Sequence, residues 1–134
     1  ILVTPLSRIP TQGGDVLHAM KQCDPDFCGF GEACFSWVDV GAIKAGKHHT
    51  EMTMNLVAPV GNGKFVFLTD YADAPRTEET GVDHYSRLTV PPGIWFGFKG
   101  LTSPRSLLLN LADILHRANE VDRLPISEIE YDWK

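Results

Sequence analysis

No apolar run in this sequence approaches the roughly 20 residues that a helix needs to cross a bilayer. The N-terminus also lacks a basic stretch followed by an apolar one, so we expect neither a membrane span nor a secretory signal. Cysteine is scarce, and the three cysteines are Cys23, Cys28 and Cys34. Their odd number argues against a disulfide framework, and the lack of C-x-x-C spacing argues against a zinc site. Together these absences predict a cytoplasmic protein with free thiols.

Basic residues are outnumbered, with 12 Lys and Arg against 17 Asp and Glu and a net charge of −5. A protein that held nucleic acid by its phosphates would carry the opposite balance, so we expect no nucleic-acid partner. The 134 residues are 43% hydrophobic and 22% charged, which is ordinary globular composition. No repeat, linker or low-complexity tract divides the chain, and we expect one domain over residues 1–134.

Twelve Gly and nine Pro separate short runs in which apolar and polar residues alternate. This punctuation is typical of an all-β sandwich or small barrel. Ala33–Val40 is predicted to be a strand with one buried face. Met52–Val60 and Lys64–Thr69 are predicted to be two further strands, and Gly61-Asn62-Gly63 predicts a hairpin turn between them.

The C-terminal third contains a competing signal. From Pro104 onward, Leu residues recur with the spacing of one helical face, which predicts a helix. Asn119–Leu124 is predicted to make one helical turn, and Ile129–Trp133 a last extended piece. The tail from residue 113 to 134 holds six acids and three bases, which predicts a solvated face.

The densest polar cluster is Lys-Ala-Gly-Lys-His-His at Lys44–His49. Between Gly41 and Lys64 this acidic chain is locally net positive by two, because three lysines face one glutamate. On an extended segment, Lys47 and His49 point to one side and His48 to the other. Lysine suits a phosphate or carboxylate, and histidine exchanges protons near neutral pH. The alternative is a solvated loop at the rim of a sheet.

The sequence resembles the dTDP-4-dehydrorhamnose 3,5-epimerase family, a branch of the cupin-like barrels, from about Thr4 to Trp133. No single matching piece is specific, but their order and spacing together are. The pieces are Gly13-Gly14-Asp15-Val16-Leu17, Phe30-Gly31-Glu32, Phe35-Ser36, Gly41 to His49, Pro59-Val60-Gly61 leading to Asp70, Pro91-Pro92-Gly93, Gly97-Phe98, and Ile129-Glu130-Tyr131-Asp132-Trp133.

The resemblance implies an all-β, cupin-type jelly-roll barrel with short helical turns near the C-terminus. It also implies a homodimer that binds a nucleotide-linked deoxysugar and uses no metal or organic cofactor. The family places a strand after Pro104. On that ground we expect Ser106–Leu111 to be extended and buried on both faces, in place of the helix that periodicity predicts.

The epimerases remove a proton beside the sugar ketone with a histidine paired to an aspartate, and return one through a tyrosine. Their motif Arg-Gly-x-His-x-Gln aligns with Lys44 to His49, so Lys44 matches the arginine that holds the diphosphate. The histidine falls on Lys47, and the glutamine falls on His49. The chain has no tyrosine between Tyr85 and Tyr131, and only one residue follows the closing tryptophan. The standard epimerase set is therefore unmatched.

We interpret the chain as a nucleotide-sugar epimerase or isomerase-like protein that acts on or binds a dTDP-4-keto-6-deoxysugar. Lys47 and His49 are the candidate catalytic residues. The expected substrate-binding residues are Lys44, His48, Glu32 and Asn110. The first alternative is a non-catalytic sugar-nucleotide-binding cupin. The second is a metal-dependent cupin, which is disfavoured because Lys47 and Phe96 stand where wider cupins have metal-binding histidines.

Overall fold

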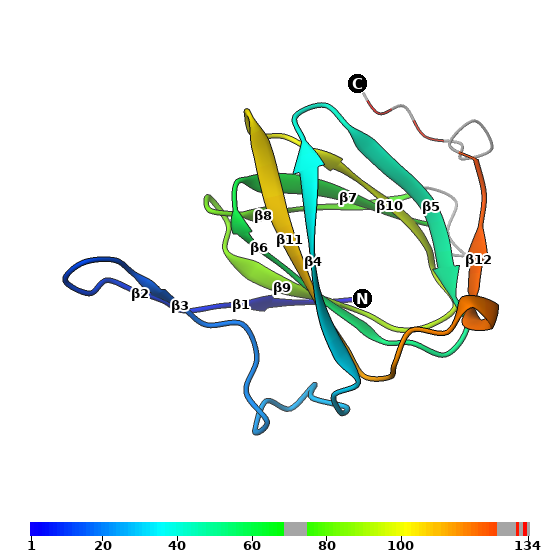
Figure 1. The fold of residues 1–134 in the computed structure, drawn as a ribbon, viewed down its shortest axis with the longest axis horizontal. Coiled ribbons are helices and arrows are strands. Elements are labelled where there is room, and N and C mark those ends of the chain that lie inside the picture. The colour runs from blue at the N-terminus through cyan, green and yellow to red at the C-terminus, as the bar shows by residue number, and fades with distance from the viewer. Residues whose placement is uncertain (69–74, 126–130, 132, 134) are drawn as a thin grey trace.

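A computed structural model describes residues 1–68, 75–125, 131 and 133 of the chain (Figure 1). Within these ranges the regular structure is β-strand apart from one 3-10 turn, so the predicted all-β class is confirmed. No described helix is long and apolar enough to span a membrane. In chain order the elements are β1 (Leu2–Pro5), β2 (Arg8–Ile9), β3 (Val16–Leu17), β4 (Glu32–Asp39), β5 (Ile43–His49), β6 (Met54–Val60), β7 (Asn62–Leu68), β8 (Arg76–Gly81), β9 (Ser86–Val90), β10 (Trp95–Gly100), β11 (Arg105–Ala112), η1 (Ala118–Glu120) and β12 (Val121–Arg123).

Two five-stranded antiparallel sheets form the barrel (Figure 1). The first has the order β1-β9-β6-β11-β4, and the second has the order β12-β5-β10-β7-β8. Along most of the chain, successive strands alternate between the two sheets, which is the connectivity expected of a jelly roll. The short β2-β3 hairpin projects away from the barrel (Figure 1).

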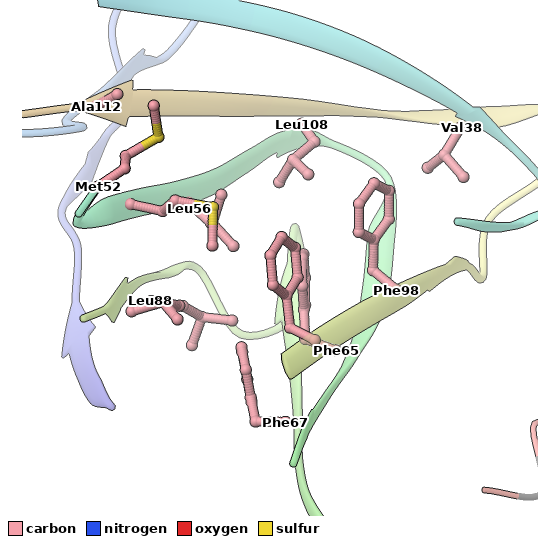
Figure 2. Packing of buried hydrophobic residues seen from close by; sticks show 12 residues of the cluster. Val38, Met52, Leu56, Phe65, Phe67, Leu88, Phe98, Leu108 and Ala112 are labelled. Carbon is pink, nitrogen blue, oxygen red and sulfur yellow. The ribbon is translucent and has the colours of Figure 1, made fainter. Parts of the chain in front are cut away.

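The core lies between the inner faces of the two sheets (Figure 2). Phe65, Phe67 and Phe98 of the second sheet point toward Leu56 and Leu108 of the first. The Phe65 and Phe98 ring centroids are 5.7 Å apart. Burying each such side chain contributes about 1.5–3 kcal/mol, so this layer holds the sheets together. The strand alternation that aims these residues inward also decides which side chains can line a site.

The turn at Gly61-Asn62-Gly63 is not the predicted hairpin. It joins β6 to β7, which belong to different sheets. Gly61 has a φ of +74°, and a Cβ there would lie 2.3 Å from the Ser106 Oγ. The Asn62 backbone amide donates to the Thr102 Oγ1 at 3.0 Å. The residue pattern therefore marks a chain reversal correctly, whereas contacts with distant residues turn the reversal into a crossing between sheets.

The helix that periodicity predicts after Pro104 is wrong, and the strand implied by the resemblance is present as β11. Leu108 faces the core and is buried. Leu107 and Leu109 point outward and are only half-buried, so the expectation of burial on both faces is met on one face alone. The extended piece predicted at Ile129–Trp133 falls largely outside the described residues.

The outer face of the first sheet differs between its two halves. Over β9, the fully buried Arg87 donates to both carboxylate oxygens of Asp26 at 2.8 Å. This contact ties the segment before β4 onto the sheet. Over β4 and β6 the outer face stays open, with Phe35, Trp37 and Val60 exposed at 66%, 46% and 45%. One half of the face is therefore sealed by a buried ion pair, and the other half presents apolar side chains to solvent.

Candidate functional site

A cavity of about 350 Å³ opens between the inner faces of the two sheets. Its deep part is apolar, and its polar lining includes more basic than acidic side chains. The apolar lining consists of Met52, Met54, Leu56, Phe96, Phe98, Leu108 and Val121. The polar lining consists of Glu32, Cys34, Ser36, Lys44, Lys47, His49, Asn110, His116 and Arg123. A ligand with an anionic end and a less polar end would match this division.

Strand β5 supplies three of the basic side chains, Lys44, Lys47 and His49. Lys47 lies opposite Phe96 of β10, and Lys44 lies opposite Phe98. The register shifts between Phe96 and Gly97, which inserts one extra residue into β5. Such a bulge redirects side chains. Because of it, two lysines three positions apart both face the cavity, where strict alternation would have turned one of them outward.

His49 ends β5 and forms a buried pair with Glu120 at the end of η1. The His49 Nδ1 and the Glu120 Oε1 are 2.6 Å apart, with the two side chains 9% and 2% exposed. The second carboxylate oxygen, Oε2, accepts the backbone amides of Glu51 and Met52 at 3.2 Å each. Burial by itself would raise the pKa of Glu120, but the hydrogen bonds from His49 and from the two amides bring it below its ordinary value. The carboxylate is therefore ionised at neutral pH.

His48 is the one expected site residue that the structure does not bring to the cavity. Alternation along β5 turns it to the outer face, where its ring stacks on Trp95 with centroids 4.9 Å apart. Its Nδ1 lies 3.3 Å from the Asp122 Oδ2. The sequence had placed it on the side opposite Lys47 and His49, and substrate binding by His48 gains no support from this position.

Three cations gather at one end of the cavity. Lys44 and Lys47 come from β5, and Arg123 of β12 lies directly opposite Lys47 in the strand register. Burial lowers the pKa of Lys47, and the neighbouring charges of Arg123 and Lys44 lower it further. Lys44 donates to the carbonyl oxygen of Trp37 at 2.8 Å. No carboxylate of the described residues forms an ion pair with these three cations, so they are available to an anionic ligand.

Glu32 and Asn110, the other two expected residues, also line the cavity. Glu32 is already engaged, because its Oε1 accepts the backbone amide of His116 and its Oε2 lies 3.6 Å from the Cys34 Sγ. Burial raises the pKa of the Cys34 thiol, and the charge of Glu32 raises it further, which keeps that thiol protonated. The buried Oδ1 of Asn110 has no hydrogen-bond partner, so it can accept one from a ligand.

No group of three or more His, Cys, Asp or Glu side chains in the described ranges is arranged to hold a metal ion. Among the described residues, Glu120 is the carboxylate in contact with His49, and both of its oxygens already accept hydrogen bonds. The donor set of the cavity therefore does not form a metal site among the residues described.

A crystal structure of a dTDP sugar isomerase from Desulfovibrio desulfuricans G20 is similar to this chain throughout. The two share 33% sequence identity over 98% of this chain and 89% of the other, with a TM-score of 0.93. The chain belongs to the dTDP-sugar isomerase family. No family model matches the sequence, and a search of curated proteins gave no match.

Two other solved structures have the same fold as this dTDP-sugar isomerase family member, but their sequences are less similar to it. A sugar 3,4-ketoisomerase from Thermoanaerobacterium thermosaccharolyticum, solved with TDP, is 18% identical over 92% of this chain and 87% of its own, with a TM-score of 0.77. A dTDP-4-dehydrorhamnose 3,5-epimerase from Bacillus anthracis str. Ames, solved with TDP and PPi, is 16% identical over 96% and 80%, with a TM-score of 0.80. The predicted cupin-type barrel and the nucleotide-sugar epimerase or isomerase-like class are thus confirmed.

Sequence reasoning missed two residues that shape the site of this dTDP-sugar isomerase family member. Glu120 and Arg123 belong to the acidic tail that was expected to be a solvated face, yet Glu120 is 2% exposed. The only available signal was the predicted helical turn at Asn119–Leu124, because η1 at Ala118–Glu120 sets the direction of the Glu120 side chain. Its partner His49 lies 71 positions earlier in the chain.

Proposed function

We propose that this chain binds the diphosphate of a TDP-linked 4-keto-6-deoxysugar in the cavity and isomerises or epimerises the sugar. The observation that carries the proposal is the meeting of Lys44, Lys47 and His49 in one cavity with an apolar interior. Similarity to a dTDP sugar isomerase supports it. A related 3,4-ketoisomerase, solved with TDP-4-keto-6-deoxyglucose, supports the substrate class.

The cations and the acid-base group divide the work. Lys44, Lys47 and Arg123 hold the phosphates, and each charge-assisted contact contributes about 1.5–3 kcal/mol. The sugar enters the apolar part, where its ketone makes the hydrogens on the adjacent carbons acidic. A group on β5, either Lys47 or His49, removes one of these protons, and a proton then returns to carbon. Asn110 offers an acceptor to a sugar hydroxyl through its free Oδ1.

Exchange with deuterated water tests the reaction. Purified protein is incubated with TDP-4-keto-6-deoxyglucose in D₂O, and the sugar is examined by NMR and mass spectrometry. We expect deuterium on a carbon next to the ketone, at a rate proportional to enzyme concentration. Binding of TDP without incorporation would support the alternative of a sugar-nucleotide-binding cupin without chemistry. Failure to bind any TDP compound would contradict the proposal altogether.

We also propose that the chain is a homodimer whose interface covers the open outer face over β4 and β6. The exposed Phe35, Trp37 and Val60 make this face apolar, and β4 is an edge strand with unpaired backbone groups. Light scattering should give twice the mass of one chain. Trp37→Glu should shift the protein toward monomer, whereas Leu115→Glu, at an exposed position outside the strands, should leave the mass unchanged.

A cytoplasmic location remains part of the proposal. All three cysteines are free in the structure, which is typical of a reducing compartment. Fractionation of the source cells should recover the protein with cytoplasmic markers.

A further inference from the structure

We propose that Glu120 is the positioning residue that makes His49, rather than Lys47, the acid-base group of this cavity. The inference rests on the proposed function, because it names the group that moves the proton there. His49 does not stand where the epimerase motif has its catalytic histidine, because that position is Lys47 in this chain. The His49–Glu120 pair is a different histidine–carboxylate arrangement, built from the end of β5 and the η1 turn.

The hydrogen bond between the two side chains sets the tautomer of His49. The ionised Glu120 carboxylate can only accept, so the proton of the shared hydrogen bond belongs to the His49 Nδ1. In the neutral ring the lone pair must then sit on Nε2. That nitrogen makes no hydrogen bond with any residue in the described ranges, and His49 is part of the cavity wall. The ring therefore presents a free base to the ligand space.

Glu120 is fixed in its own position from two directions. Its Oε2 accepts the backbone amides of Glu51 and Met52, where the chain turns from β5 into β6. Its backbone carbonyl accepts the amide of Thr50 at 2.8 Å and the Thr50 hydroxyl at 3.0 Å. A carboxylate held in this way cannot turn from the imidazole without leaving buried donors unsatisfied. In catalytic triads a fixed carboxylate orients the imidazole base in the same way.

Lys47 has surroundings of the opposite kind. It faces the cations Arg123 and Lys44, and no carboxylate in the described ranges pairs with it. A lysine among cations suits a diphosphate, which satisfies all of them at once. The charged or titratable groups that line the cavity with His49 are these three cations, Glu32 on β4, Cys34 on β4 and His116 between β11 and η1. Glu120 is the one in direct contact with the imidazole.

The decisive variant is Glu120→Gln, which keeps the shape but has one oxygen in place of two. The backbone amides of Glu51 and Met52 need that oxygen as their acceptor, so the amide nitrogen of the new side chain turns to the His49 Nδ1. It can only donate, which places the histidine proton on Nε2 and removes the free base from the cavity. The matched control is Asp122→Asn, which alters the outward-facing partner of His48 in the same way.

We expect Glu120→Gln to lower kcat for deuterium exchange by at least about 10²-fold, with KM and TDP affinity changed less than about threefold. The acid limb of the pH–rate profile should move to lower pH, because a neutral amide stabilises the imidazolium less than a carboxylate does. Asp122→Asn should leave kcat, KM and the profile unchanged. A merely structural role for Glu120 would lower the amount of active protein without moving the profile.

Nitrogen-15 NMR of histidine-labelled wild-type protein supplies a readout that does not depend on activity. We expect the His49 ring, assigned by its loss in His49→Asn, to carry its proton on Nδ1. A proton on Nε2 would overturn the inference, as would a Glu120→Gln enzyme with unchanged kcat and pH profile. If wild-type protein binds no TDP-sugar yet shows the Nδ1 tautomer, the proposed function fails while the geometry stands.

Discussion

Two histidine–carboxylate pairs join the end of β5 to the segment formed by η1 and β12, and they differ in distance and in burial. His49 is joined to Glu120 at 2.6 Å, with side chains 9% and 2% exposed. His48 is joined to Asp122 at 3.3 Å, with side chains 21% and 64% exposed. The single step along β5 moves the side chain from the cavity to the outer face. The comparison teaches that environment, and not residue type, makes a histidine a candidate base.

The largest expected effect comes from replacing each of the two histidines in a separate variant. His49→Asn should reduce deuterium exchange by about 10²–10⁴-fold, the usual contribution of a positioned acid-base group. His48→Asn should change it by less than about threefold, since that ring stacks on Trp95 outside the cavity. The measurement is the exchange rate at saturating TDP-4-keto-6-deoxyglucose. Equal losses of exchange rate in the two variants would contradict the assignment of His49, and not His48, as the base.

The same contrast should appear in stability. Glu120→Ala leaves the His49 ring and two backbone amides without their acceptor, and each buried donor left unsatisfied costs about 1–3 kcal/mol. Asp122→Ala removes a solvent-screened contact that contributes less than about 1 kcal/mol. Urea unfolding measures both free energies. A loss for Asp122→Ala as large as that for Glu120→Ala would mean that the outer pair also supports the fold.

The sequence predicted the histidines of β5 better than the carboxylates that contact them from η1 and β12. Alternation along Lys44–His49 correctly separated His48 from His49, because side-chain direction on a strand is a local property. The bulge that turns Lys44 inward could not be predicted, since it appears only in the register with β10. Glu120 was hidden for a related reason, because its burial depends on a partner 71 positions away. Resemblance supplied the barrel and its β11 strand, which periodicity alone had assigned to a helix.

A third comparison sets Lys47, inside the cavity, against a basic residue outside it. Lys47→Met should weaken TDP binding by about tenfold or more, in line with about 1.5–3 kcal/mol per charge-assisted contact. Arg76→Met is the control outside the cavity, since Arg76 pairs with Glu78 on the partly exposed strand β8. Because the pKa of Lys47 is lowered, wild-type affinity should begin to fall with rising pH before an ordinary lysine would lose its charge. Lys47→Arg should keep its affinity over that pH range, as calorimetric titration can show.

The smallest expected effect concerns the stability that Glu120 contributes at acid pH. The pKa of Glu120 lies below its ordinary value of 4.5, so the folded state favours the ionised form. The resulting stabilisation is complete above the unfolded-state pKa and is lost as the pH falls through the lowered folded-state value. The difference in unfolding free energy between wild type and Glu120→Gln should therefore narrow as the pH falls through that range. A difference that stays constant over this pH range would contradict the stabilisation of the ionised Glu120 carboxylate by the fold.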